Sequence, residues 1–412
     1  TDGCHPNPGG HRVLAATMLP ALEMPLGHST RIRERMLRVD RPVRVVCFGD
    51  SVTGVYYHTG SRRAYTAMLG LALEAAVPGT RVRAINAGIS GHTTADGLSR
   101  IDKDVLAHKP DIVTVMFGLN DMVRVSPADY RKNLVTIVGR CRKIGAEVVL
   151  ATPNNVIDTP RRPTDRLVEY CDVVRSVGRD LDVPVCDCFR GYDAIRHHDR
   201  KDWRLLMSDQ IHPNMDGHRR IARQLARAIT GRRVRLEHVH PIEPAIPRTL
   251  SLLNAGRPIR VLAMPPFDAS IAGVLQKLKP GVQVEVTSWP VSGQSLKTIE
   301  REAAKRVRSM KPDLVLVAVP RNAEAASREE FINAFSWIMN HSLSFSYQQW
   351  DCVMIHPSVV DPDGDEAGRD KLVRRLVRAQ DLHLVDRPVG SRDDSVKILE
   401  HWIGRQWMPE SR

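Results

Sequence analysis

Between residues 41 and 230 the chain alternates short apolar runs with helix-length segments, and this alternation constrains its fold more than any other feature. Runs rich in Val, Ile and Leu are typical of strands that are buried on both faces of a sheet. Strands separated by helices form βαβ units and a parallel sheet with helices on both faces. The predicted strands are Val43–Gly49, Arg81–Asn86, Ile112–Phe117, Glu147–Ala151 and Val183–Cys186. The predicted helices lie near Arg62–Val77, Thr94–His108, Asp129–Ile144, Thr164–Leu181 and Gly217–Ile229.

The second half of the chain repeats this pattern after a proline-rich stretch. Residues 231–257 show no clear periodicity and contain several prolines, so we predict an interdomain linker there. Three segments of the first half then recur: 41–46 as 257–262, 109–115 as 311–317, and Ser90-Gly91 as Ser292-Gly293. The last two share an offset of 202 residues. We interpret the repeat as an internal duplication, with a second domain at 258–412.

Length and composition are those of a globular protein with full hydrophobic cores. The 412 residues suffice for two or three domains at roughly 100–200 residues each. The hydrophobic share is 42% and the charged share 26%. No apolar run approaches the roughly 18–20 residues that a membrane span needs, so we predict no span.

The formal net charge of +13 suggests a nucleic-acid partner. However, the arginines are scattered over the predicted helices, aromatic residues make up only 5%, and no nucleic-acid-binding motif is present. We therefore predict no nucleic-acid partner. The excess charge is interpreted as solvated surface with a mild attraction for acidic substrates.

The seven cysteines are an odd number without the spacing of a disulfide framework. This favours a reducing compartment such as the cytoplasm, although the sequence leaves the localisation open. The beginning of the chain is unusual, because Asp2–His11 resembles Asp209–His218 and also runs into a helix. We interpret residues 1–25 as the C-terminal remnant of an upstream domain of the same kind, and a targeting signal is therefore left open.

The first predicted strand ends in the polar turn Gly49-Asp50-Ser51-Val52-Thr53. In open α/β sheets, ligands bind at the carboxyl ends of the strands. Ser51 is therefore a candidate nucleophile. The alternative for this residue alone is a serine that caps a helix N-terminus.

A serine hydrolase also needs a base, an acid that orients the base, and donors for the oxyanion. The loops after the next two strands supply Gly91, whose backbone N–H can approach a substrate closely, and Asn120, whose side chain has N–H donors. Asp209 precedes His212 by three residues in a loop. That spacing lets the carboxylate face one ring nitrogen of His212 while the other faces Ser51.

Taken together, Gly-Asp-Ser, Gly91, Gly-x-Asn-Asp and Asp-x-x-His-Pro-Asn resemble the four motif blocks of the SGNH (GDSL) hydrolase family over residues 41–230. The resemblance implies a three-layer, flavodoxin-like α/β/α sandwich without a metal or organic cofactor. It implies Ser51 as nucleophile, His212 as general base and acid, and Asp209 as the residue that orients His212. The oxyanion hole would consist of the Ser51 and Gly91 N–H groups and the Asn120 amide. The known activities of this family are esterase, lipase, thioesterase, acyltransferase and carbohydrate O-deacetylase.

Several polar residues near these motifs have simpler interpretations. Asp50 and Asp121 are typical of turns and are expected to support the loops. His218 falls in the first turn of the last helix and is interpreted as packing or capping. Tyr56, Tyr57, Arg62 and Arg63 follow the nucleophile and are candidates for lining the acyl or alcohol pocket.

The second copy departs from the family pattern. Gapless comparison puts Phe267 where Ser51 stands and Pro265 where Gly49 stands, while Gly293 and Asn322 keep the oxyanion positions. The polar segment before the last helix contains no histidine. We therefore predict that 258–412 is an inactive SGNH-like domain, structural or substrate-binding.

The sequence thus predicts two tandem α/β/α domains with parallel sheets, one of them a carboxylic ester hydrolase that forms an acyl-enzyme. The expected substrate is a small-molecule or carbohydrate ester with a short acyl group, with acetylated carbohydrate as one candidate. The rival hypothesis is a non-catalytic carbohydrate-binding or scaffold protein with a vestigial site. The alcohol and the oligomeric state are left open.

Overall fold

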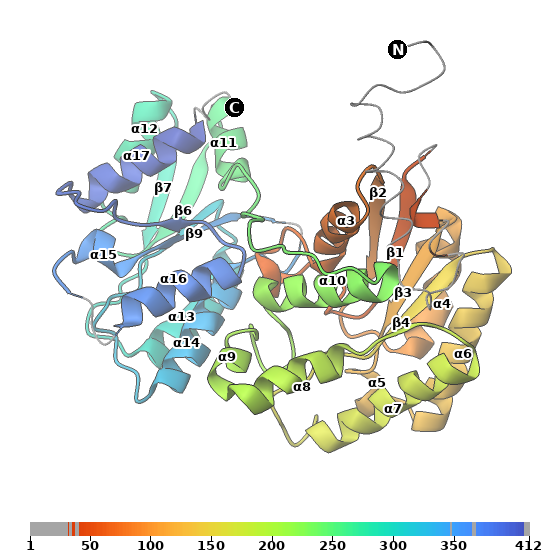
Figure 1. The fold of residues 1–412 in the computed structure, drawn as a ribbon. Helices are drawn as coiled ribbons and strands as arrows, with labels where there is room; N and C mark the ends of the chain where they lie inside the picture. The colour runs from red at the N-terminus through yellow and green to blue at the C-terminus, as the bar shows by residue number, and fades with distance from the viewer. Residues whose placement is uncertain (1–31, 33–34, 38–40, 347, 365–367, 408–412) are drawn as a thin grey trace, which may run out of the picture. The chain divides into compact units, whose positions relative to one another are not determined.

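The computed structural model describes residues 32, 35–37, 41–346, 348–364 and 368–407. The remnant predicted at 1–25 lies outside the described residues. The chain forms two compact units (Figure 1). Among the described residues, the first unit consists of those up to Val55 together with Arg63–Val239, and the second of Tyr56–Arg62 together with those from His240 onwards.

The first unit contains a parallel sheet with the strand order β2-β1-β3-β4-β5. This order is the flavodoxin-like arrangement, so the predicted fold class is confirmed. Strand β1, which lies between β2 and β3, is buried along its length except at Arg44. The strands are β1 (Val43–Gly49), β2 (Val82–Gly88), β3 (Ile112–Met116), β4 (Glu147–Ala151) and β5 (Val185–Cys186).

Helices cover both faces of this sheet (Figure 1). On one face α3 (Tyr65–Ala76) packs against α10 (Met215–Thr230). On the other, α6 (Pro127–Lys143) lies between α4 (Thr94–Asp104) and α7 (Thr164–Asp180). The shorter helices are α5 (Asp121–Arg124), α8 (Cys188–His198) and α9 (Arg200–Arg204), with a 3₁₀ turn at Leu106–His108. A second 3₁₀ turn, Tyr57–Thr59, belongs to the second unit.

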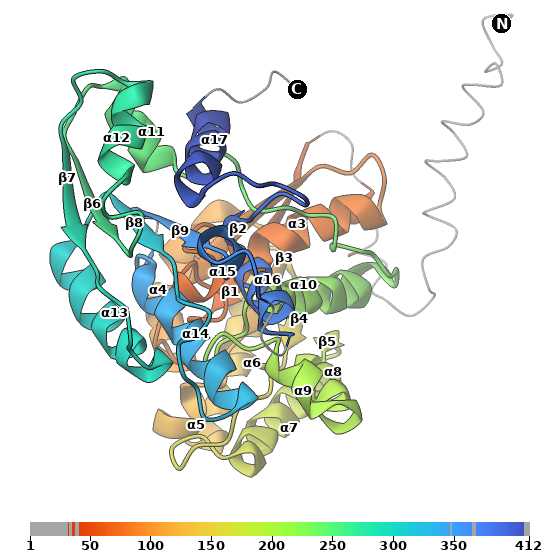
Figure 2. The same cartoon turned by 90° about the vertical axis from the view of Figure 1, so that its left-hand side faces the viewer.

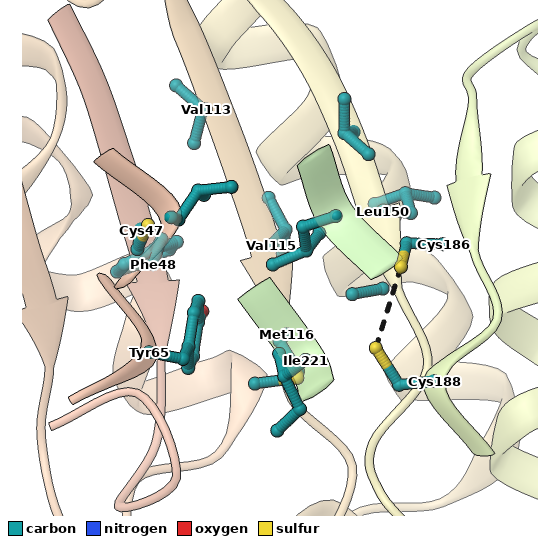
Figure 3. Close-up of a cluster of buried hydrophobic side chains, with 14 of the residues drawn as sticks. Cys47, Phe48, Tyr65, Val113, Val115, Met116, Leu150, Cys186, Cys188 and Ile221 are labelled. Atoms are coloured by element: carbon teal, nitrogen blue, oxygen red, sulfur yellow. Dashed lines mark hydrogen bonds between the residues drawn. The ribbon is translucent and has the colours of Figure 1, made fainter. Parts of the chain in front are cut away.

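Figure 3 shows part of the core between the sheet and α10, where Val115, Leu150 and Ile221 are buried together. Two sulfur atoms also lie there, those of Cys186 and Cys188, and they are 3.6 Å apart. A disulfide needs about 2.05 Å. All six cysteines in the described part of the chain are free and buried, and burial raises the pKa of the Cys47 thiol to about 11. These residues act as small hydrophobes.

Two helices begin with side-chain caps directly after the loops that carry the motifs. At the start of α4, the Thr93 side chain accepts a hydrogen bond from the Asp96 N–H, and the Asp96 carboxylate accepts one from the Thr93 N–H. At the start of α10, the Asn214 side chain accepts a hydrogen bond from the Gly217 N–H. Such caps satisfy backbone donors that the first helical turn leaves open. They fix the ends of the Gly91 and His212 loops.

The second unit contains its own parallel five-stranded sheet, with the order β10-β9-β8-β6-β7. This is the same arrangement as in the first unit, because β7, β6, β8, β9 and β10 take the places of β2, β1, β3, β4 and β5. The strands are β6 (Ile259–Ala263), β7 (Val284–Ser288), β8 (Leu314–Val317), β9 (Asp351–Ile355) and β10 (Leu384–Val385). Its helices are α11 (Pro247–Asn254), α12 (Ile271–Leu278), α13 (Leu296–Met310), α14 (Arg328–Ser342), α15 (Pro357–Val360), α16 (Arg369–Ala379) and α17 (Ser395–Trp407). Helices α13 and α14 pack side by side (Figure 2).

The two sheets also share their strand register. In the first unit Val45 pairs with Ile112, and in the second Val261 pairs with Leu314. These are equivalent positions when β6 is shifted by 216 residues from β1 and β8 by 202 residues from β3. The gapless sequence comparison uses the same shifts.

The repeated Lys-Pro-Asp segment has the same structural task in both units. The Asp111 carboxylate accepts a hydrogen bond from the Arg44 N–H at 2.9 Å, and Asp313 accepts one from the Arg260 N–H at 2.9 Å. Each aspartate also pairs with an arginine outside the strand, Arg41 and Arg248 respectively. In each unit the carboxylate satisfies a backbone donor near the start of the first strand, β1 or β6, which explains the repeat of this motif.

The structure differs from the expectation for 231–257 in one respect, because this segment contains the helix α11. Pro247 occupies its first position, where the missing N–H of proline costs nothing. The Thr249 N–H and hydroxyl both donate to Asp351 at 2.6 and 2.7 Å. This contact fastens the segment to β9. Within the described residues, no helix is long and apolar enough to cross a membrane.

Candidate active site

Ser51 lies in a tight turn at the carboxyl end of β1. The Asp50 carboxylate accepts a hydrogen bond from the Val52 N–H at 2.9 Å, and the Asp50 carbonyl accepts one from the Thr53 N–H at 3.1 Å. Position 49 has no space for a side chain, because a Cβ there would lie 2.1 Å from the Thr53 hydroxyl oxygen and 2.5 Å from the Met116 carbonyl oxygen. Glycine is therefore required. The Ser51 side chain is held in this turn, and the residue is 6% exposed.

The structure brings Ser51, His212 and Asp209 together in one hydrogen-bonded series. Ser51 Oγ lies 2.7 Å from His212 Nε2, and His212 Nδ1 lies 2.7 Å from Asp209 Oδ2. The other Asp209 oxygen accepts hydrogen bonds from the N–H groups of Ile211 and His212 at 2.9 and 2.8 Å. A single carboxylate thus holds both the backbone and the ring of His212.

Burial and charge act in opposite directions on this pair. Burial by itself raises the pKa of Asp209, but the charge of His212 and the hydrogen bonds to the carboxylate outweigh it and hold the pKa well below its usual value. Burial lowers the pKa of His212, but the Asp209 carboxylate outweighs it and raises the pKa above the usual 6.5. The imidazolium form of His212 is therefore stabilised, as a general base requires once it has accepted a proton.

The two remaining predicted residues follow the neighbouring strands. Gly91, after β2, has a φ of +78°, a backbone conformation that favours glycine. Asn120, after β3, is 8% exposed, and its Nδ2 donates to the His92 carbonyl at 3.1 Å. An amide nitrogen carries two N–H groups, so this contact uses one of them.

The supporting residues have the tasks expected from the sequence. Asp121 accepts hydrogen bonds from the Thr94 N–H and hydroxyl at 2.8 and 2.5 Å and so ties the Asn120 loop to α4. Burial raises the pKa of Asp50 to about 7. His218 Nδ1 accepts a hydrogen bond from the Tyr65 N–H at 2.8 Å.

One residue near the site was missed by sequence reasoning. Arg162 lies in the loop between β4 and α7 and donates to the Leu119 carbonyl at 3.0 Å and to Asn120 Oδ1 at 3.3 Å. Nothing in its spacing relates it to the motifs, because it belongs to none of the four blocks. Only a surplus of arginine in that loop, Arg161-Arg162, could have drawn attention to it.

Tyr56 and Tyr57 belong to the second unit, although they follow Ser51 closely in the chain. The Tyr56 ring lies 4.9 Å from that of Phe345, and the Tyr57 carbonyl accepts a hydrogen bond from Gln380 at 2.9 Å. The structure therefore gives both tyrosines packing partners in the second unit. In the described part of the chain, no three His, Cys, Asp or Glu side chains lie together in a way that could hold a metal ion.

A parallel α/β sheet with a hydrogen-bonded Ser-His-Asp series at its carboxyl edge is the arrangement of a serine hydrolase. Residues 47–220 match the model of the GDSL-like Lipase/Acylhydrolase family. The chain therefore carries a GDSL-like lipase/acylhydrolase (SGNH) domain over these residues. The match does not extend to residues 240–412, which form the larger part of the second unit.

The relatives found by sequence include several esterases. The acetylxylan esterase of Geobacillus stearothermophilus is 26% identical over 215 residues, which are 47% of this chain and 96% of that protein. The arylesterase of Vibrio mimicus is 26% identical over 187 residues, 45% of this chain and 88% of that protein. Among solved structures, a lipase/acylhydrolase from Enterococcus faecalis is 31% identical and covers 47% of this chain and 99% of its own, with a TM-score of 0.40. The family match and the sequence relatives confirm the predicted class of carboxylic ester hydrolase.

Proposed function

We propose that this protein is a serine esterase that removes short acyl groups through an acyl-enzyme on Ser51. The observation that carries the proposal is the continuous series Ser51–His212–Asp209, with both contacts at 2.7 Å. A serine hydroxyl is a weak nucleophile unless a base accepts its proton. His212 lies within reach of that proton, and Asp209 stabilises the charge that His212 then acquires.

In the proposed reaction, Ser51 Oγ attacks the carbonyl carbon of the ester while His212 Nε2 accepts the hydroxyl proton. The negative charge on the carbonyl oxygen is stabilised by the Ser51 and Gly91 N–H groups and by the Asn120 amide. The intermediate then collapses, the alcohol leaves with the proton from His212, and the acyl group stays on Ser51. Water, activated by His212, releases the acid and restores the serine.

For the substrate, we propose acetyl groups on a carbohydrate. The support is the similarity to a protein named acetylxylan esterase, which covers nearly the whole of that relative. A panel of 4-nitrophenyl esters from acetate to decanoate, together with acetylated xylo-oligosaccharides, tests this proposal. We expect kcat/KM to fall as the acyl chain lengthens and acetate to be released from the oligosaccharides. A preference for decanoate would contradict it.

The nucleophile is tested with variants of the series. Ser51→Ala and His212→Ala are each expected to lower kcat by several orders of magnitude, because members of a triad act as a unit. Asp209→Asn should cost somewhat less. If Ser51→Ala kept more than about a tenth of the activity, a loss below roughly 1.4 kcal/mol, Ser51 would not be the nucleophile.

We propose that the second unit is an inactive copy of the first. The position equivalent to Ser51 in the shared register is Phe267, which is fully buried. Asn322, the equivalent of Asn120, lines a cavity of about 280 Å³ together with the ion-paired Arg321. The residues that line this cavity include no serine or cysteine that could replace the missing nucleophile.

The rival hypothesis, a binding or scaffold protein with a vestigial site, makes a different prediction for a serine-reactive aryl phosphonate. An activated Ser51 is expected to be labelled, and the label should be absent in Ser51→Ala. An unlabelled, folded wild-type chain would favour the rival.

A further inference from the structure

Arg162 is connected to the proposed oxyanion hole by two hydrogen bonds from one guanidinium group. Its Nε donates to the carbonyl of Leu119 at 3.0 Å, and its Nη2 donates to Asn120 Oδ1 at 3.3 Å. One bond thus holds the backbone just before Asn120, and the other holds the side chain of Asn120 itself.

The backbone of Arg162 is itself fixed. Its N–H donates to the Thr159 carbonyl at 3.0 Å and lies 3.1 Å from the Thr159 hydroxyl, while the Thr159 N–H donates to the Arg162 carbonyl at 3.3 Å. These bonds close a small antiparallel bridge between the two residues. The guanidinium therefore extends from an anchored turn, and the side chain is half-buried.

The two ends of the Asn120 amide have partners of opposite kind. The His92 carbonyl can only accept a hydrogen bond, so it selects the nitrogen end at 3.1 Å. Arginine can only donate, so Arg162 selects the oxygen end. An amide with such partners has one favoured orientation, in which its second N–H is kept as a donor. In the reversed orientation, the amide oxygen would face the His92 carbonyl and the amide nitrogen would face a cation.

The charge of Arg162 has a second effect on the same amide. A cation that is hydrogen-bonded to the amide oxygen withdraws electron density from the nitrogen and makes its N–H groups better donors. The donor is needed when negative charge develops on the substrate oxygen, so this effect acts on the transition state.

We propose that Arg162 is a positioning residue of the oxyanion hole: it orients the Asn120 carboxamide and strengthens its N–H as a donor. The inference rests on the proposed function. It names no new contact with the substrate, and Arg162 acts through Asn120.

A double-mutant cycle on the full chain tests this inference, with 4-nitrophenyl acetate as substrate. Asn120→Ala is expected to lower kcat by about 10²–10³-fold. Arg162→Ala is expected to lower kcat by about 10–100-fold and to change KM less than about threefold. In the Asn120→Ala background, Arg162→Ala should cause no further loss, because the group through which it acts is gone.

Two further variants separate positioning from general structural support. Arg161→Ala changes the neighbouring exposed arginine and should leave kcat and KM unchanged. Arg162→Gln keeps a neutral N–H donor and should fall between wild type and Arg162→Ala. Thermal unfolding of every variant identifies any that fail to fold, and Arg162→Gln then serves as the first arm of the cycle.

Three outcomes would overturn the inference. Losses that multiply in the double variant would show that Arg162 acts independently of Asn120. An effect confined to KM would make Arg162 a substrate-binding residue. If Arg161→Ala lowered kcat as much as Arg162→Ala, the effect would come from the positive charge of the loop and not from the contact with Asn120. If Ser51→Ala stayed active, the proposed function itself would be wrong. An inactive Ser51→Ala with independent Arg162 and Asn120 effects would contradict only this inference.

Discussion

Charge in the candidate site is controlled at the scale of single residues by burial. Asp50, next to the nucleophile, is 2% exposed, and burial raises the pKa of its carboxyl to about 7. The Asp50 carboxyl affects the titration of His212, because a negative charge on Asp50 adds to that of Asp209 in raising the pKa of His212. Two acids thus favour the imidazolium, one by direct contact and one through space.

This arrangement predicts the pH dependence of activity. The general base must be neutral to accept a proton, so kcat/KM should rise with pH through the pKa of His212, which lies above 6.5. Asp50→Asn keeps an oxygen for the Val52 N–H but removes the charge. The pKa of His212 should fall, and the acidic limb of the profile should move to lower pH. Asp165→Asn, at an exposed position of α7, is the matched control. If the acidic limb of the Asp50→Asn profile stayed at the wild-type pH, the Asp50 carboxyl would be neutral over the whole pH range measured.

At the scale of elements, the end of β1 and the helices beside it depend on close backbone approach. Gly49→Ala would bring a methyl group within 2.1 Å of the Thr53 hydroxyl oxygen, so we expect a loss of several kcal/mol in the free energy of unfolding together with loss of activity. Gly139→Ala is the counterpart, since nothing lies within 4 Å of that position on α6. It should stabilise by up to about 1 kcal/mol. Urea denaturation measures both, and equal effects would contradict the steric argument.

His218 joins two helices, because its ring on α10 accepts the N–H of Tyr65 at the start of α3. Burial lowers the pKa of His218 to about 3. The unfolded chain therefore binds a proton more readily, and stability should be lost as pH falls from about 6.5 towards 3. His218→Ala should cost roughly 1–3 kcal/mol at pH 8, where the Tyr65 N–H loses its acceptor. The difference between wild type and variant should shrink at pH 5. A difference that does not change with pH would argue against a neutral histidine in the fold.

At the scale of the whole molecule, the chain passes from the Ser51 turn directly into the second unit. Tyr56–Arg62 packs there, with the Ser61 hydroxyl donating to the Ser344 carbonyl at 2.5 Å. A chain that ends at Val239 would leave this segment without those partners. We expect it to lose activity on a small aryl acetate and on acetylated oligosaccharides together. If activity on the aryl acetate survived and only that on the oligosaccharides fell, the second unit would serve substrate binding instead.

The sequence by itself determined the strands of the first sheet and five of the helices beside it, and it predicted the residues of the candidate site. Hydrophobic periodicity is a local property, so β1 could be predicted at its observed bounds and the other strands within a few residues. Asp209 and His212 are three residues apart, and their contact follows from that spacing. The carboxyl ends of parallel strands meet at one edge, which brings Ser51 to them.

Only the tertiary structure decided which distant polar groups meet. Arg162 reaches Asn120 across 42 residues of sequence, and Tyr56–Arg62 packs in a different unit from the serine that it follows. Helix α11 depends likewise on Asp351, which is 102 residues away from Thr249. A polar side chain has many partners of suitable chemistry, and the free energies of the alternatives differ little. The packing of the apolar core selects among them, and that packing is a property of the whole chain.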